Sequence, residues 1–204
     1  YDCLGEHNYL KQDDPRLVAA IAQGERYLAI DYGTVNPFVC LDIRLHDGKL
    51  VVVSEWRWDS AERRRQMTDA EYADQVIRLS GSGVAVSAVI VDPSAASFIL
   101  ELRRRGMHVK SADNEVLEGI RKTSTLMADG RLLIARDSCP YTMQELTDYR
   151  WDSKAAATGV ERPLKQNDHG TDALRYAVST LWLRAENSRT ESNCSRRPVN
   201  VLLY

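Results

Sequence analysis

A short apolar segment that ends in an acid is the feature that most constrains the fold of this chain. Residues 27–31 are Tyr-Leu-Ala-Ile-Asp, and Gly33 follows two positions later. This pattern predicts a buried β-strand whose last side chain reaches solvent, and the glycine allows the backbone to turn tightly away from it. We therefore expect the strand to place the Asp31 carboxylate at one edge of a sheet.

Two later segments carry acids in comparable positions. Asp92 follows the fully apolar run 88–91 and precedes a proline, and Asp172 lies in the polar segment 167–176. A short, fully apolar run is typical of a strand that is buried in a parallel sheet. We expect Asp31, Asp92 and Asp172 to converge in the folded chain.

The order of the remaining elements predicts an α/β fold. Strands are expected at 27–31, 38–45 and 50–58, and the pair Asp47-Gly48 predicts a hairpin turn between the last two, so these three strands should be antiparallel. Helices then alternate with short apolar strands, which indicates a mixed sheet flanked by helices, as in RNase H-like proteins. The expected helices are 15–22, 68–80 (opened by a capping box at Thr68 and Glu71), 94–105, 114–129, 140–149 and 168–185, and the further strands are 88–92, 107–111 and 132–134.

Composition excludes several classes of protein. The chain has 204 residues, of which 44% are hydrophobic and 27% charged, as expected for a globular domain. No apolar run approaches the length needed to cross a membrane, and a signal peptide is not expected. The four cysteines are far apart and form no CxxC pair, so neither a disulfide framework nor a zinc site is expected.

The formal net charge of −2 does not by itself favour a nucleic-acid partner. Basic residues are nevertheless clustered at 63–65, 103–105, 121–122 and 196–197. Each cluster alone is explained as a solvated helix face, whereas several together would form a basic surface around an acidic centre.

Three converging aspartates suit the hydrolysis of a phosphodiester bond. This reaction needs an activated water, neutralisation of phosphate charge and stabilisation of the leaving oxygen, and two divalent cations supply all three. Mg²⁺ and Mn²⁺ prefer oxygen ligands such as carboxylates. Asp31, at the end of the first strand, is predicted to bridge the two cations, and Asp92 and Asp172 would each complete one site.

Each acid also has a structural explanation. Asp92 precedes a proline and Asp31 lies near a glycine, so either side chain is also suited to forming a turn. Asp168 is best explained as the N-cap of the last helix. His169 lies three residues before Asp172 and shares its helix face, so it either orients Asp172, binds a metal or moves a proton, or it is a buried structural histidine.

The segment 163–176 resembles the signature of the nuclease domain of large terminase subunits, the motors that package DNA into tailed bacteriophages. Segments 30–33 and 91–93 resemble the other two acidic motifs of that family, in the same order, and the resemblance covers residues 26–185. It implies an RNase H-like fold and an endonuclease that uses two Mg²⁺ or Mn²⁺ ions to cut concatemeric viral DNA. The catalytic residues carried over are Asp31, Asp92, Asp172 and His169, and the metal ligands are the three aspartates.

The resemblance also implies a β-hairpin at 149–165 beside the active site. Lys165 is expected to contact a DNA phosphate, and Trp151 either packs the hairpin or contacts a base. Arg121 and Lys122 are added as DNA-binding candidates from their basic cluster. The implied partners are double-stranded DNA and, in the full protein, an ATPase domain, the portal and a small terminase subunit, in the cytoplasm of the host cell at the procapsid.

The expected division of the chain follows from this resemblance. Residues 1–25 are predicted to connect to an upstream ATPase domain, 26–186 to form the nuclease domain, and 187–204 to form a flexible polar tail. No GxxxxGK[ST] phosphate loop is present in the sequence, so ATP-driven translocation is not expected within it.

Other functions remain open from sequence. The segment 30–34 also resembles the phosphate-binding turn of actin-like ATPases and sugar kinases, although that fold needs two such halves. An RNase H-like resolvase or transposase would share the metal chemistry. A non-catalytic module that docks DNA or a capsid protein is disfavoured, because gathering three acids is costly without a metal to offset their charges.

Overall fold

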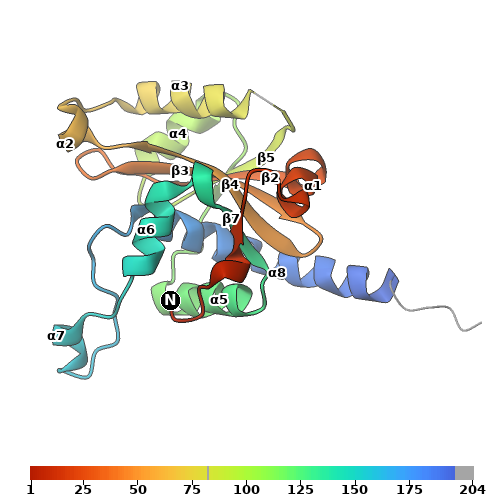
Figure 1. Ribbon diagram of the computed structural model, residues 1–204. Helices are drawn as coiled ribbons and strands as arrows, with labels where there is room; N and C mark the ends of the chain where they lie inside the picture. The colour runs from red at the N-terminus through yellow and green to blue at the C-terminus, as the bar shows by residue number, and fades with distance from the viewer. Residues whose placement is uncertain (82, 196–204) are drawn as a thin grey trace, which may run out of the picture.

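The centre of the molecule is a seven-stranded mixed β-sheet (Figure 1). The computed structural model describes residues 1–81 and 83–195, and the strands within them lie in the order β1-β7-β4-β3-β2-β5-β6. The strands are β1 (Tyr9–Leu10), β2 (Glu25–Asp31), β3 (Phe38–His46), β4 (Lys49–Trp58), β5 (Val86–Val91), β6 (Val109–Ser111) and β7 (Leu132–Ala135).

The three strands β2, β3 and β4 pair antiparallel, and the other neighbours in the sheet pair parallel. Asp47 and Gly48 join β3 to β4 with φ angles of 50° and 70°, the left-handed conformation that a tight hairpin turn requires. The predicted α/β fold, with three antiparallel strands followed by parallel ones, is therefore confirmed.

The helices α1, α3, α4, α5 and α6 begin and end within two residues of the predicted positions, whereas the short helices α2 and α7 were not predicted. Thr68 caps α3 as expected: its hydroxyl accepts a hydrogen bond from the Glu71 amide at 3.3 Å, and the Glu71 carboxylate accepts one from the Thr68 amide at 2.8 Å. The helices are α1 (Pro15–Gln23), α2 (Ser60–Arg63), α3 (Asp69–Ser80), α4 (Ala96–Arg104), α5 (Val116–Ala128), α6 (Pro140–Asp148), α7 (Ser153–Ala156) and α8 (His169–Ser195), with 3-10 turns at Glu6–Asn8 and Arg136–Ser138.

Helices cover both faces of the sheet, with α3 and α4 on one side and α5, α6 and α8 on the other (Figure 1). Because successive side chains of a strand point to opposite faces, β2 divides its residues between two cores. Leu28 and Ile30 pack toward α3 and α4, whereas Tyr27 and Ala29 pack toward α8. Asp31 continues the second series, so its carboxylate faces α8.

The first 25 residues pack onto the sheet. β1 pairs with β7 in parallel, and Leu17 and Ala20 of α1 bury against Val51 of β4 and Leu133 of β7. These residues thus belong to the same folded body. Their role as a connector to an ATPase domain remains a prediction.

The predicted β-hairpin at 149–165 is wrong in its secondary structure. The segment does fold back on itself, but its only described pairing is a single antiparallel bridge between Trp151 and Pro163. Between them lies the short helix α7, whose first turn is capped by Asp152 through the amides of Lys154 and Ala155. Lys-Ala-Ala favours a helical turn, so the pairing does not extend beyond this bridge into a regular hairpin.

The last helix, α8, extends beyond its predicted end near residue 185 to Ser195. Part of the predicted flexible tail is therefore helical, and residues 196–204, with the basic pair 196–197, lie outside the described residues. Among the helices of the described chain, none is long and apolar enough to cross a membrane. Cys3, Cys40 and Cys139 are free thiols.

Candidate active site

The carboxyl ends of β2 and β5 place two of the predicted acids side by side. The strands pair in parallel with Ile30 opposite Val91. Asp31 and Asp92 are the next residues on these two neighbouring strands. Adjacent strands lie about 4.8 Å apart. Like Asp31, Asp92 continues the series of positions that faces α8, because Ala88 and Ile90 belong to the core on that side.

The turn after Asp31 depends on Gly33. A Cβ at this position would lie 2.7 Å from the carbonyl oxygen of Pro37, which is closer than side-chain atoms approach a backbone. The glycine is therefore required by the close return of the chain, as the sequence predicts, although the reason is packing rather than a left-handed backbone.

The start of α8 contacts Asp31 directly. His169 and the Asp31 carboxylate lie 2.9 Å apart, Nδ1 to Oδ2. Burial opposes the charged form of His169, but the hydrogen bond and negative charge of Asp31 outweigh it and raise the histidine pKa. Of the roles considered for His169, the geometry favours orientation of an acid, and that acid is Asp31 rather than Asp172.

Asp172 is buried one turn further along α8, and positively charged side chains hold both of its oxygens. Oδ1 accepts hydrogen bonds from Arg175 Nη2 at 3.0 Å and Nε at 3.2 Å. Oδ2 accepts one from Lys165 Nζ at 3.0 Å. Arg175 is itself buried and also donates to the carbonyl of Asn114 at 3.0 Å.

Asp92 forms the turn that its sequence suggests and also faces the site. Oδ1 accepts the amide of Ser94 at 2.7 Å, and Oδ2 accepts Asn114 Nδ2 at 3.2 Å. Burial opposes ionisation of Asp92, but hydrogen bonds from Ser94, Asn114 and Tyr176 outweigh it and lower its pKa.

The charges of all three acids act on the side chain of Tyr176. It is buried one turn after Asp172, and burial raises its pKa, with the negative charges of Asp31, Asp172 and Asp92 raising it further. The pKa of Asp31 is likewise raised, first by burial and then by the charge of Asp172, although the hydrogen bond from His169 opposes this. These pKa shifts agree with the geometry, in which Asp31 and Asp92 follow neighbouring strands and α8 brings His169 and Asp172 to the same edge of the sheet.

The donor chemistry of this cluster fits a hard divalent cation, because three carboxylates supply the oxygen ligands that such a cation prefers and their negative charges repel one another without it. The described residues do not, however, contain three His, Cys, Asp or Glu side chains arranged as a metal coordination sphere. Each aspartate has at least one carboxylate oxygen hydrogen-bonded to another residue of the protein.

The residues predicted to bind DNA are spread more widely over the structure than the three aspartates. Lys165 is at the site, in its ion pair with Asp172. Arg121 lies 4.0 Å from Glu118, and Lys122 lies 3.7 Å from Asp113, so their described ion pairs do not reach the three acids. Trp151 is 50% exposed and forms the bridge with Pro163, so both a packing role and a contact with a base stay open.

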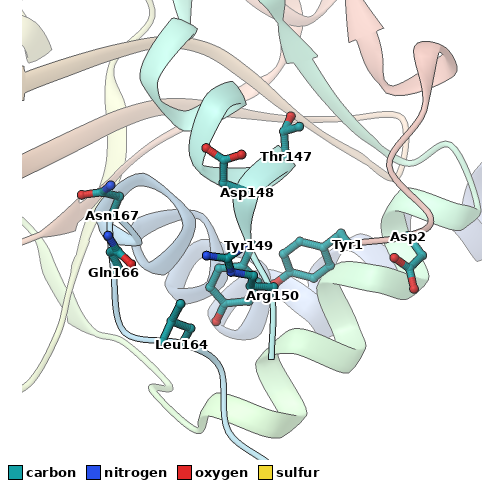
Figure 2. Close-up of a pocket in the computed structure, with 9 residues that line it drawn as sticks. All are labelled: Tyr1, Asp2, Thr147, Asp148, Tyr149, Arg150, Leu164, Gln166 and Asn167. Atoms are coloured by element: carbon teal, nitrogen blue, oxygen red, sulfur yellow. The ribbon is translucent and has the colours of Figure 1, made fainter. Parts of the chain in front are cut away.

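A polar cavity of about 590 Å³ adjoins the start of α8. Figure 2 shows it between the end of α6 and the segment before α8, with the Tyr149 ring near that of Tyr1. These two rings stack with centroids 5.2 Å apart. The three aspartates do not line this cavity, whose walls are Tyr1, Asp2, Thr147, Asp148, Tyr149, Arg150, Leu164, Gln166 and Asn167.

Glu145 was missed from sequence. Its Oε2 accepts hydrogen bonds from the amides of Gly170 at 2.6 Å and Thr171 at 3.1 Å, so it caps the N-terminus of α8 from the neighbouring helix α6. Gly170 is required here, since a Cβ would overlap the Thr142 side chain. The available signal was that Glu145 shares the buried face of α6 with Thr142 and Leu146, where an acid needs a partner.

Replacing Glu145 with glutamine should remove a pH dependence of stability. Burial raises the pKa of Glu145 to about 7, from an ordinary value of 4.5. The folded state therefore binds the proton more tightly than the unfolded chain, so this contribution to stability is present below pH 4.5 and is lost as the pH rises through 7. Because glutamine keeps an acceptor oxygen and does not ionise, the variant should gain on the order of 1–3 kcal/mol over the wild type between about pH 5 and 8.

Urea unfolding of both proteins across this pH range measures the effect. Glu118→Gln, at an exposed position of α5, is the matched control and should follow the wild type. Parallel stability curves for Glu145→Gln and the wild type would show that Glu145 does not titrate in the folded protein.

Comparison with solved structures finds large terminases. The structure of the large terminase from the thermophilic bacteriophage D6E is 36% identical over 89% of this chain, with a TM-score of 0.82. This chain spans 45% of that protein. Structures of the D6E protein in complex with ADP and with ATP-gamma-S match this chain as well. No family model and no curated protein matches the sequence.

Two isolated nuclease domains share the fold at lower identity. That of the P22 large terminase is 16% identical, with a TM-score of 0.66, over 90% of this chain and 93% of the P22 domain. That of the bacteriophage SPP1 large terminase, solved with bound Mn, is 17% identical, with a TM-score of 0.56, over 83% of this chain and 94% of the SPP1 domain.

Proposed function

Because this chain belongs to the bacteriophage large terminases, we propose that it is their nuclease domain, a Mg²⁺- or Mn²⁺-dependent endonuclease that cuts concatemeric viral DNA during genome packaging. The observation that carries this proposal is that Asp31 and Asp92 follow paired residues of neighbouring strands, while α8 places His169 on Asp31 and Asp172 one turn further along. Gathering three negative charges is costly for a fold, and a divalent cation offsets that cost.

The three aspartates would hold two cations, with Asp31 as the shared ligand and Asp92 and Asp172 on either side. When bound, such cations supply an activated water and neutralise the charge of the scissile phosphate. The SPP1 domain, which shares this fold and was solved with bound Mn, supports the use of a divalent cation.

The remaining residues of the site would position these ligands. His169 orients Asp31 through its 2.9 Å contact, and Arg175 fixes the Oδ1 side of Asp172. Asn114 and the Ser94 amide fix Asp92. Such supporting hydrogen bonds set both the orientation and the basicity of metal ligands.

The substrate is proposed to be double-stranded DNA, contacted by Lys165, Arg121, Lys122 and Trp151. Because the D6E protein is about twice as long and is seen with ADP and ATP-gamma-S, we propose that the domain works beside an ATPase domain. The portal and a small terminase subunit would be further partners, in the cytoplasm of the host cell.

Incubating the purified chain with supercoiled plasmid tests this function. We expect nicked and linear products with Mn²⁺ or Mg²⁺ and none when a chelator is added. If the protein binds DNA but remains inert with both metals and with supercoiled, linear and branched DNA, it is a non-catalytic binding module. Strong preference for a four-way junction over plain duplex would instead favour a resolvase.

A further inference from the structure

The two positively charged side chains that contact Asp172, Arg175 and Lys165, differ in how firmly they are fixed. The Arg175 side chain is 2% exposed and is tied both to Asp172 and to the backbone carbonyl of Asn114. The Lys165 side chain is 62% exposed, and its described ion pairs are with Asp172 and Asp168 alone. Arg175 is therefore part of the packed fold, whereas Lys165 can exchange with another cation.

Lys165 places its charge between two carboxylates. Its Nζ is 3.0 Å from Asp172 Oδ2 and 3.4 Å from Asp168 Oδ2. The Asp168 oxygen is buried and makes no hydrogen bond among the described residues, so its interaction with Lys165 is an ion contact without hydrogen-bond geometry. A point charge between carboxylate oxygens is the position that a divalent cation would take.

We propose that Lys165 is a built-in competitor for the metal at Asp172. In the absence of metal, its ammonium neutralises Asp172, and a cation can use Oδ2 only after the lysine has moved away. Lys165 thereby raises the metal concentration needed to load this position. The inference rests on the proposed function, because it assumes that Asp172 is a metal ligand.

DNA would relieve this competition. Lys165 lies just before α8, at the end of the segment that folds back through the single bridge between Trp151 and Pro163. This position leaves the ammonium at the rim of the site, where a phosphate of bound DNA is a competing anion. Once the lysine pairs with phosphate, Asp172 becomes available, so DNA and metal should bind cooperatively.

Binding of Mn²⁺ to the full chain, measured without DNA by calorimetry and by the electron paramagnetic resonance signal of free Mn²⁺, tests this inference. At constant ionic strength, Lys165→Met should bind Mn²⁺ about 2–5-fold more tightly than the wild type, since partly exposed ion pairs have energies of this size. Lys165→Gln should show a similar gain in Mn²⁺ affinity, because it also removes the positive charge. Lys154→Met is the matched control: it removes a lysine of the same segment that makes no described contact with Asp172, and it should leave the affinity unchanged.

A second measurement adds a duplex with non-hydrolysable linkages. It should tighten Mn²⁺ binding to the wild type and have a smaller effect on Lys165→Met. Equal or weaker Mn²⁺ binding by both Lys165 variants would overturn the competition while leaving the metal site intact. Absence of Mn²⁺ binding by the wild type and the variants alike would overturn the proposed function itself.

Discussion

Replacing Asp31 with asparagine is expected to reduce Mn²⁺-dependent cleavage of plasmid DNA by about 10³-fold or more. The bridging ligand of two cations contributes several kcal/mol to stabilising the charge of the transition state, and each 1.36 kcal/mol corresponds to about a tenfold change in rate. The asparagine side chain is nearly isosteric with aspartate and would still accept a hydrogen bond from His169, so the loss would report the charge.

The fold should survive this substitution. Burial and the nearby charge of Asp172 raise the pKa of Asp31, so removing its charge should leave the melting temperature unchanged or higher. Asp137→Asn, at an exposed position of the 3-10 turn after β7, is the control and should cut at the wild-type rate. Wild-type cleavage by Asp31→Asn would show that Asp31 is not a ligand.

Replacing Arg175 with methionine should cause a large loss of stability, on the order of 3–5 kcal/mol. Arg175 is buried, and it is the fixed partner of the buried Asp172 carboxylate. Removing one member of a buried ion pair leaves the other charge uncompensated in a poorly solvated environment. The free energy of unfolding from urea denaturation measures the effect.

Two further variants separate this cause from a general loss of packing. Arg121→Met removes an arginine that is 70% exposed, and it should change stability by no more than about 0.5 kcal/mol. The double variant Arg175→Met, Asp172→Asn removes both charges and should be more stable than Arg175→Met alone. A loss below about 1 kcal/mol for Arg175→Met would mean that Lys165 or water compensates Asp172.

Local patterns in the sequence predicted much of the fold. The apolar run ending at Asp31, the Asp47-Gly48 turn and the Thr68–Glu71 capping box all act through neighbours along the chain, and the structure confirms each of them. The order of the acidic motifs predicted the family correctly. The phosphate-binding alternative for residues 30–34 is wrong, because the chain matches large terminases over most of its length.

Predictions failed where local preference was weak or the partner was distant. In segment 149–165, Asp152 and the following alanines favour a helical turn over the expected strands. Glu145 was missed because its partners, the amides of Gly170 and Thr171, lie 25 and 26 positions away. Periodicity shows that a residue faces the core, but not which group it meets there.

The sequence by itself therefore determined most of the strands and helices, the alternation that turns Asp31 and Asp92 toward one face, and the residue types suited to divalent cations. Only the tertiary structure decided how these acids are held. It places His169 on Asp31, 138 positions away, and it shows Arg175 and Lys165 dividing the two oxygens of Asp172. The physical reason is that backbone preferences act over a few residues, whereas charge compensation depends on which side chains the packed helices and strands bring within hydrogen-bonding distance.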